Sequence, residues 1–457
     1  MAQLSVSSAE SVANIEELLS QILVWVPALS LIRFKCVSKH WLALISDPEF
    51  RRRHTLRNPN SKISAFFSPQ TSEETFESIR LGNHEIPPRC NPFKTLNNSV
   101  ADESKLRILQ SCNGLFLCHI PIFGEQTKHH PVYVVNPTTN QFRVLSSPTV
   151  KEDMDIMAFV RYALAFDPST SPHYKVVCVN NFPHYYKRGQ HKIDIYSSET
   201  GKWKRLEVPF FPSPSDVGRH HDSMKQAMHF DSRSREGAVY CNGAVHWTRD
   251  RGVESLPFCW FPDDRVGFTR EETDVLHYFD IGQERLLVAP ATPPVPLVVK
   301  NIPLKVSGFG CKTPTVWPSL TKRYFGECGG CLYLIETYKH CNTQFDVMEM
   351  ERDYSGWLVK YHVDLNPLVA ALNPGQDWNG FEVLCLSQEE ETDNGVEDSS
   401  ADLLLHMPGK VISYNFWNKS FKTSVELANK ELFLASRHNH RTREDVIFPY
   451  METLACL

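Results

Sequence analysis

The chain lacks the features that mark membrane proteins, general nucleic-acid binders and disulfide-rich secreted domains. No apolar run among its 457 residues approaches the roughly 18 residues that cross a bilayer. Lys and Arg number 48 against 53 Asp and Glu, so no excess of positive charge is present to attract nucleic acid or anionic lipid. The 13 cysteines are odd in number and scattered, which is typical of a reducing compartment. We therefore expect a soluble protein of the cytoplasm, the nucleus or both, with no nucleic-acid and no membrane partner.

The motifs of the common active sites are also missing. There is no Gly-rich phosphate loop followed by Lys-Ser/Thr, and no Gly-x-Ser-x-Gly turn around a nucleophile. The segment 328–341 contains Cys-x-x-Cys followed by His-Cys, which resembles a zinc site. However, Cys328 repeats a position beside a hairpin turn that Cys112 and Cys241 also occupy, where a small half-buried residue fits. We therefore expect no metal, no cofactor and no catalysis.

Residues 14–53 have the spacing of three short helices. Apolar residues recur every three or four positions in two stretches separated by Pro27. Ser30 is placed to cap the second helix, and the third is expected to end at Asp47-Pro48. Apolar residues cover more helical faces than a unit of roughly 40 residues can bury by itself. The pattern therefore predicts that a second polypeptide completes its core.

After residue 60 the pattern changes from helical to strand-like. Short runs rich in Val, Ile, Phe and Tyr alternate with turn signals such as Asn-Gly, Gly-Gly and Asn-Pro. One hairpin pattern occurs repeatedly: a strand, a polar turn, and a strand that opens with an aromatic or basic residue. Its copies begin at Val132, Ile193, Leu276, Phe345 and Val411.

A second hairpin precedes most of these copies. Its turn is Asn113-Gly114, Asn242-Gly243 or Gly329-Gly330, and such pairs supply the positive φ angles that a two-residue hairpin turn requires. In the second unit a longer segment beginning at Phe166 fills the same place. Two hairpins give four antiparallel strands, which is the blade of a β-propeller. Five such units fall within 105–424.

Strand-like segments are left over at 62–67 and 445–450, and joining them gives a sixth blade without exposed edges. The expected fold is therefore mainly β. A small three-helix N-terminal unit over 14–58 precedes a propeller of about six four-stranded blades over 59–457, closed by N- and C-terminal strands. Residues 1–13, rich in Ser and Ala, are expected to be a disordered N-terminus without a secretory signal.

The expected propeller has two unlike faces. Because successive strands alternate in direction, the short hairpin turns of the first four units lie on one face and the longer links lie on the other, where binding usually occurs. Three of these links mix aromatic residues with arginine or histidine, the composition of protein interfaces. The alternative is that these side chains pack within their own loops. The candidate substrate-binding residues are Tyr185, Tyr186, Arg188, Phe211, Arg219, His221, Arg251, Trp260 and Phe261.

The N-terminal unit resembles the F-box. Leu-Leu-x-x-Ile-Leu from Leu18, Val-Pro before Leu-x-Leu, Arg-Phe-x-Cys-Val-Ser-Lys-x-Trp from Arg33 and Leu-Ile-Ser-Asp-Pro-x-Phe from Leu44 stand in the family's order. The family usually opens with Leu-Pro where this chain has Asn14-Ile15, and Ile15 supplies an apolar contact. The resemblance implies binding to the small Skp-type adaptor of a cullin-RING ubiquitin ligase. The alternative is an ordinary three-helix bundle without a partner.

We expect the apolar residues of this unit to supply the adaptor-binding surface. The set is Ile15, Leu18, Leu19, Ile22, Leu23, Pro27, Leu29, Leu31, Phe34, Val37 and Trp41.

The remainder resembles the F-box-associated, kelch-like propeller domain of plant F-box proteins. The family's marks here are Ser-Cys-Asn-Gly-Leu at 111–115, Asn-Pro-Thr-Thr at 136–139, Ala-Phe-Asp-Pro at 165–168, and Tyr-x-x-x-Leu-x-x-Leu over 450–457. The two resemblances imply a non-catalytic substrate receptor of an SCF-type (Skp–cullin–F-box) E3 ubiquitin ligase, with an unknown target protein on the propeller. The alternatives are a scaffold that binds the adaptor without delivering a target, and a ligand-binding propeller with an unrelated helical cap.

Overall fold

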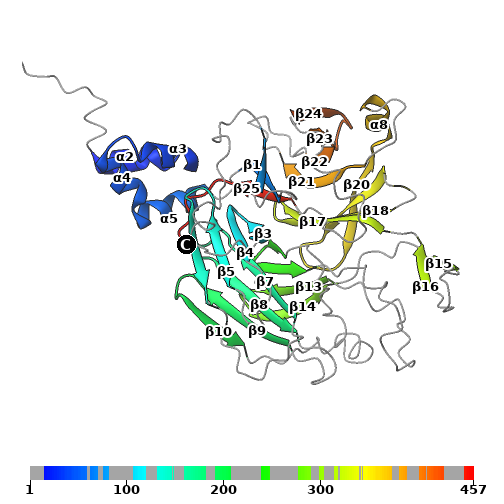
Figure 1. The fold of residues 1–457 in the computed structure, drawn as a ribbon, viewed down its shortest axis with the longest axis horizontal. Helices are drawn as coiled ribbons and strands as arrows, with labels where there is room; N and C mark the ends of the chain where they lie inside the picture. Colours follow the sequence, from blue (N-terminus) through cyan, green and yellow to red (C-terminus); the bar gives the residue numbers. More distant parts are fainter. Residues whose placement is uncertain are drawn as a thin grey trace, which may run out of the picture.

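The computed structural model comprises a small helical unit, residues 15–58, and a ring of β-sheets (Figure 1). None of the helices that it describes is long and apolar enough to cross a membrane. The described residues are 15–58, 62–69, 76–81, 106–119, 131–146, 148, 159–181, 191–206, 238–247, 276–289, 298–302, 313–317, 320–338, 341, 343–372, 380–388, 401–407, 409–426 and 447–457.

The helical unit has four described helices instead of the three expected. The additional helix begins at Asp47-Pro48: Asp47 Oδ1 accepts a hydrogen bond from the Phe50 N–H (2.8 Å), and Pro48 takes the first helical position. The expected cap at Ser30 is wrong, because the second helix already begins at Ala28 and contains Ser30. The helices are α2 (Glu16–Leu23), α3 (Ala28–Phe34), α4 (Lys39–Ser46) and α5 (Pro48–Arg57).

The four helices enclose one cluster of buried apolar side chains. Two polar contacts hold α5 against the loop that follows α2: His54 Nε2 lies 2.8 Å from the Val26 carbonyl, and Asn58 Nδ2 donates to the Val24 carbonyl (3.0 Å). One member of the cluster, Leu454, comes from the far end of the described sequence. The buried members are Leu19, Leu23, Ala28, Leu31, Leu44, Ile45, Phe50 and Leu454.

Five four-stranded antiparallel sheets follow in chain order, and each corresponds to one predicted unit. Blade 1 contains β3 (Arg107–Cys112), β4 (Leu115–His119), β5 (Val132–Asn136) and β6 (Gln141–Leu145). Blade 2 contains β7 (Phe159–Ala165), β8 (Lys175–Asn181), β9 (His191–Ser197) and β10 (Lys202–Leu206). Blade 3 contains β11 (Val239–Cys241), β12 (Ala244–Trp247), β13 (Leu276–Asp280) and β14 (Arg285–Ala289).

Blades 4 and 5 repeat the same order. Blade 4 contains β17 (Leu320–Cys328), β18 (Cys331–Tyr338), β19 (Gln344–Met350) and β20 (Trp357–Asp364). Blade 5 contains β21 (Glu382–Gln388), β22 (Ala401–Met407), β23 (Lys410–Asn415) and β24 (Phe421–Glu426). The first strands of neighbouring blades lie against one another, and between β3 and β7 the Gln110 side chain hydrogen-bonds both the N–H and the carbonyl of Leu164 (2.7 and 2.9 Å).

The expected sixth blade is confirmed, and it closes the ring. β25 (Phe448–Met451) pairs antiparallel with β1 (Ile63–Pro69), which also pairs with β2 (Phe76–Arg80). The rings of Phe67 and Tyr450 meet edge to face across this pairing, with centroids 5.4 Å apart. Three strands of this blade are described, and β25 lies next to β3 of blade 1.

The first hairpin turns of blades 1, 3 and 4 have the predicted backbone. Asn113 and Gly114 have φ of 46° and 86°, Asn242 and Gly243 have 47° and 77°, and Gly329 and Gly330 have 59° and 75°. Successive positive φ angles match the twist of the flanking strands. Cys112, Cys241 and Cys328, which precede these turns, are all buried.

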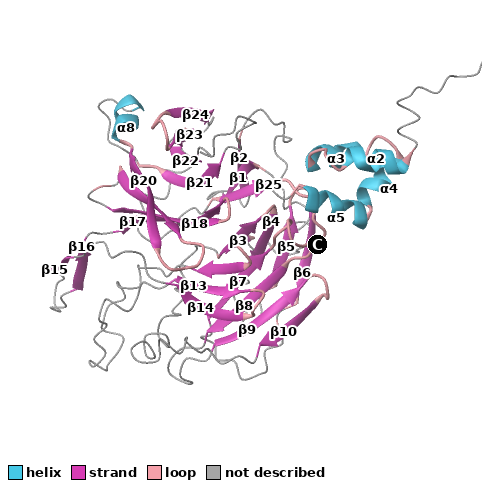
Figure 2. Ribbon diagram, turned by 180° about the vertical axis from the view of Figure 1, so that it is seen from behind, coloured by secondary structure: helices cyan, strands magenta, loops and turns pink. Residues whose placement is uncertain are grey.

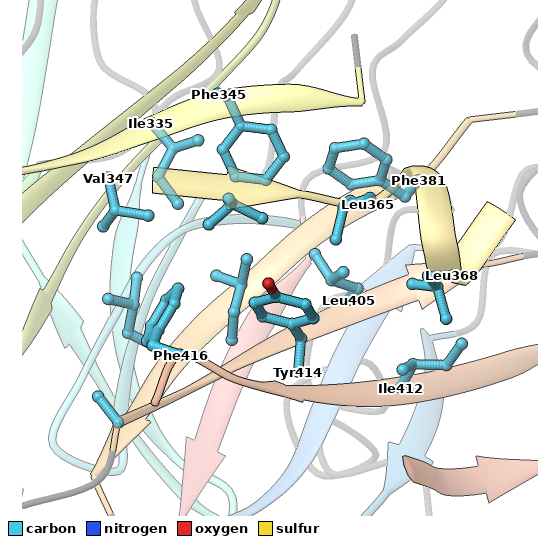
Figure 3. Packing of buried hydrophobic residues seen from close by; sticks show 14 of the residues in the cluster. Ile335, Phe345, Val347, Leu365, Leu368, Phe381, Leu405, Ile412, Tyr414 and Phe416 are labelled. Atoms are coloured by element: carbon cyan, nitrogen blue, oxygen red, sulfur yellow. The ribbon is translucent and has the colours of Figure 1, made fainter. Parts of the chain in front are cut away.

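Two described elements lie in links between blades. A separate hairpin, β15 (Val298–Ile302) paired with β16 (Thr313–Trp317), follows blade 3, and α8 (Asn366–Leu372) joins blades 4 and 5. Leu368 of α8 packs into the large cluster shared by these two blades, together with Phe381 and Ile412 (Figure 3). This short helix therefore covers the end of that core.

The helical unit lies beside blade 1 (Figures 1 and 2) and contacts the short-turn face of the propeller. Arg51 Nη2 donates to Gln141 Oε1 (3.1 Å) where β6 leaves its short turn, and the chain after β25 contacts Gly114 in the first turn of blade 1. The links between hairpins leave from the opposite strand ends. In blade 4 the expectation of a long link is wrong, because only residues 339–343 separate β18 from β19.

A buried histidine joins blades 3 and 4. His246 Nδ1 lies 3.1 Å from the Val239 carbonyl, and Nε2 lies 2.6 Å from the Tyr354 hydroxyl. Because a carbonyl only accepts, Nδ1 carries the proton and Nε2 accepts from Tyr354. The Tyr354 ring also stacks on Tyr278 at 4.2 Å. Burial lowers the pKa of His246 to about 4, so the ring is neutral at neutral pH.

We predict that Gly114→Ala lowers the thermal unfolding midpoint more than Gly243→Ala does. Both glycines have positive φ, so each substitution costs about 1–2 kcal/mol of backbone strain. A Cβ at Gly114 would additionally lie 2.7 Å from the Met451 carbonyl oxygen, whereas nothing lies within 4 Å of one at Gly243. Equal shifts for the two variants, measured by differential scanning calorimetry, would contradict the close approach of Met451 to Gly114.

We also predict that the propeller loses stability as the pH falls below about 6.5, where the unfolded histidine gains a proton that native His246 does not. The loss is at most about 1.4 kcal/mol per pH unit and ends near the native pKa. Thermal midpoints at pH 7 and pH 5 should differ less for His246→Gln than for the natural chain. A pH dependence that is identical in the two proteins would show that the fold does not lower the pKa of His246.

Candidate functional site

Helix α2 has one apolar face inside the helical unit and another outside it. Leu19 and Leu23 are 4% and 2% exposed and pack in the core of the unit. Ile15, Leu18 and Ile22 follow each other at helical spacing on the outer face and are 48%, 41% and 53% exposed. An exposed apolar row of this kind on a helix is typical of a surface that a partner covers.

The exposed apolar side chains concentrate in this unit. Of the eleven large apolar residues that are highly exposed among the described residues, six lie between positions 15 and 42. They belong to α2, to the segment after it, and to the α3–α4 region. These residues are Ile15, Leu18, Ile22, Trp25, Val37 and Leu42.

The predicted adaptor-binding set divides into three classes. Ile15, Leu18, Ile22, Pro27 and Val37 are exposed. Leu29, Phe34 and Trp41 are half-buried, and the rings of the last two meet edge to face at 5.6 Å.

Three members of the set lie inside the unit. Leu19, Leu23 and Leu31 are between 0% and 4% exposed, because they face the common core of the four helices. Their side chains are not available to a partner in this structure. Substitution there would act through folding of the unit.

Two exposed residues escaped the sequence prediction. Trp25 is 61% exposed and lies three positions after Ile22, so it continues the outer apolar row of α2. The Arg57 guanidinium lies 4.2 Å from the centre of its ring. Leu42 is 46% exposed on α4. Continuing the outer row of α2 past the end of the helix would have found Trp25, whereas no sequence signal separated Leu42 from the neighbouring core residues.

A hollow of about 310 Å³ lies beside the same unit, where the first turns of α2 and α5 approach each other. Its charged lining is mainly acidic, with Glu16 and Glu17 from α2 and Asp47 and Glu49 from the start of α5. Carboxylates at these positions favour both helix N-termini. These carboxylates are thus explained by the stability that they give to the two helices.

The predicted substrate-binding residues cannot be placed. All nine, in the links 182–190, 207–237 and 248–275, lie outside the described residues. The strands that flank these links are described, and the flanking strand ends lie opposite the short hairpin turns.

Two of the cysteines considered as zinc ligands flank a hairpin turn. Cys328 and Cys331 face each other across the β17–β18 turn, and Cys341 is half-buried, while His340 lies outside the described residues. Within the described ranges, no three His, Cys, Asp or Glu side chains gather as metal ligands would.

The buried cysteines of blades 1 and 3 are poor nucleophiles. Burial raises the pKa of the Cys112 and Cys241 thiols to about 12, so both remain protonated at neutral pH.

Comparison with known proteins agrees with this arrangement. Residues 16–53 match a family model described as the F-box domain, and residues 70–293 match one described as the F-box associated beta propeller domain. The chain is 31% identical over 464 residues to F-box protein At5g07610 of Arabidopsis thaliana, with 99% of this chain and 94% of the relative covered. It is 28% identical over 244 residues to the F-box/kelch-repeat protein At3g23880 of the same plant, with 50% and 57% covered.

Among solved structures, the chain is similar to the β-propeller domain of the Trilobed protease from Pyrococcus furiosus. The identity is 10%, the TM-score is 0.28, and 69% of this chain and 82% of the other are covered, which is too weak to bear on fold or function. The family matches and the relative that spans nearly the whole chain show that this protein belongs to the F-box proteins with an F-box associated β-propeller domain.

Proposed function

We propose that this protein is a substrate receptor of an SCF-type E3 ubiquitin ligase. The observation that carries the proposal is the outer face of α2, which presents an apolar row on a unit that matches the F-box family. A Skp-type adaptor would cover this row and connect the chain to the cullin-RING machinery. Fully burying an exposed side chain of this size contributes about 1.5–3 kcal/mol, and these side chains are already partly covered, so each would contribute roughly half of that on adaptor binding.

The two ends of the molecule suit two different partners. The F-box (residues 15–58) lies on the short-turn face, whereas the long links between strands leave from the opposite face. A target protein bound at the long links would not compete with the adaptor for surface. The receptor itself contributes binding and placement, and the chemistry of ubiquitin transfer belongs to the other subunits.

The cysteines support the compartment that we propose for this activity. Most of the ten described cysteines are buried. The 13 cysteines of the chain are odd in number and scattered, which is typical of a reducing compartment. We place the protein in the cytoplasm, the nucleus or both.

We predict that Leu18→Asp with Ile22→Asp abolishes capture of the Skp-type adaptor while leaving the thermal unfolding of the chain unchanged. Both side chains are exposed, so a carboxylate is tolerated in the free protein but is strongly unfavourable in an apolar interface. The measurement is adaptor binding by purified full-length chain in reducing buffer. Leu358→Asp, at a 55% exposed position on β20, is the matched control.

A single change at Leu19 distinguishes an interface from a core. Leu19→Asp should lower the unfolding midpoint of the F-box as well as adaptor capture, because Leu19 is 4% exposed. If the exposed double variant still binds the adaptor as tightly as the natural chain, the assignment of the outer α2 face is wrong.

We further predict that deleting residues 1–58 stabilises the proteins that the propeller binds in cells. The deletion removes the adaptor contact and leaves strands β1 to β25 intact. The measurement is the half-life of proteins captured both by the full chain and by the shortened chain, with the Leu18→Asp/Ile22→Asp chain as a second adaptor-deficient form.

The same experiment separates the receptor from a scaffold that binds the adaptor without delivering a target. A scaffold would hold its partners without changing their half-lives in any of the three chains. The alternative of an unrelated helical cap is set aside, because residues 16–53 match the F-box family.

A further inference from the structure

The segment 452–457, here called the tail, continues from β25 and lies between the F-box and blade 1. On the F-box side, Leu454 is 1% exposed and belongs to the F-box core, and to no other apolar cluster of the described residues. Arg51 of α5 donates from Nε to the Leu454 carbonyl (2.9 Å) and from Nη2 to the Ala455 carbonyl (3.1 Å). The F-box therefore obtains a core side chain and two hydrogen-bond acceptors from a distant part of the sequence.

The tail also caps a helix of the F-box. The N–H groups in the first turn of a helix have no partner within the helix. In α3 the preceding residue is Pro27, which supplies no side-chain cap, and Glu452 Oε2 accepts from the Leu29 N–H at 3.1 Å. A carboxylate at this position is also favoured by the helix dipole. Glu452 thus caps the N-terminus of α3 as Asp47 caps the N-terminus of α5.

On the propeller side, the tail is held by the second turn of blade 1. Asn136 is fully buried at the end of β5, and its Nδ2 donates to the carbonyls of Thr453 (3.1 Å) and Ala455 (2.9 Å). The Thr453 N–H donates to Thr138 Oγ1 (3.1 Å), and Ala455 is buried in the core shared by blades 1 and 2. The Leu454 side chain therefore packs in the F-box, whereas its neighbours Thr453 and Ala455 are held by the propeller.

The F-box depends on such contacts because its helices are short. They contain 7–10 residues each, fewer than the roughly 12–15 at which an isolated helix becomes marginally stable in water. Tertiary packing must therefore hold them, and one of the eight buried members of their core is Leu454. Without the tail, the core has a hole and the N-terminus of α3 has no cap.

We propose that the tail is a clamp that makes folding of the F-box conditional on closure of the propeller. The tail reaches the F-box only when β25 is paired with β1 and Asn136 holds the carbonyls that follow. A chain that has been made only as far as blade 5, or whose ring is open, then contains the complete F-box sequence but not a stable F-box. Adaptor binding, which rests on the function proposed above, is thereby restricted to molecules with a finished substrate-binding domain.

The test uses the full chain and the variant Asn136→Asp, which does not touch the F-box. In the turn, Asn136 Oδ1 accepts hydrogen bonds from the N–H groups of Thr138 (3.0 Å) and Thr139 (3.2 Å). The aspartate keeps an oxygen that can accept the same two hydrogen bonds. It loses the donation from Nδ2 and sets a carboxylate against two carbonyl oxygens. The matched control is Asp280→Asn, at the corresponding turn of blade 3, where Asp280 Oδ1 accepts from the Gln283 N–H (2.7 Å).

Hydrogen–deuterium exchange of the free chain is the deciding measurement. We expect amides of α3 and α5 to exchange at least tenfold faster in Asn136→Asp than in the natural chain, with amides of blades 3 and 4 unchanged and with no change in the control. Leu454→Ala, whose side chain lies in the F-box core alone, should give the same result. Unchanged exchange in the F-box of both variants, or equal acceleration throughout the propeller in both, would overturn the clamp.

Adaptor titration of the same proteins keeps this proposal separate from the proposed function. We expect the affinity for the Skp-type adaptor to fall at least tenfold in both variants and to be unchanged in the control. If exchange in the F-box accelerates but the natural chain shows no adaptor binding, the clamp is supported and the ligase function fails. If the natural chain binds and F-box exchange is unaffected by either variant, the ligase function stands and the clamp is wrong.

Discussion

Pairing of β25 with β1 is the constraint on which the rest of the structure depends. It supplies the innermost strand of blade 6 and thereby removes two open edges from the ring. It also fixes the starting point of the tail, so that Leu454 can enter the F-box core and Glu452 can reach α3. One antiparallel pairing between strands from opposite ends of the chain thus determines both the closure of the propeller and the position of the F-box on it.

The propeller could be predicted from the sequence because its information is local and repeated. Asn-Gly and Gly-Gly identify turns with positive φ regardless of their surroundings, and the turns at Asn113, Asn242 and Gly329 have that backbone. The alternation of strands and turns gave the five units, and the two leftover segments gave the sixth blade. The nine candidate residues for target binding belong to links whose structure is not described, so their role stays a prediction.

The F-box was less predictable, because its details depend on contacts between distant residues. Leu19 and Ile22 look alike in the sequence, and only the packing of four helices shows that one is core and the other surface. Ser30 is a good capping residue by type, yet the N–H of Leu29 in the first turn of α3 is satisfied by a carboxylate more than four hundred positions away. Asp47-Pro48 ends one helix and starts another, a double role that helix-stop rules do not anticipate.

The length of the blade strands sets the scale of any complex that uses both faces of the ring. The strands of blade 2 contain 5–7 residues, which corresponds to about 17–23 Å at roughly 3.3 Å per residue. A protein docked at the far ends of these strands is therefore separated from the F-box side by the full thickness of the disc. If the chain acts as the proposed receptor, its target needs either a large fold or a flexible segment to bring a lysine around the rim of the propeller.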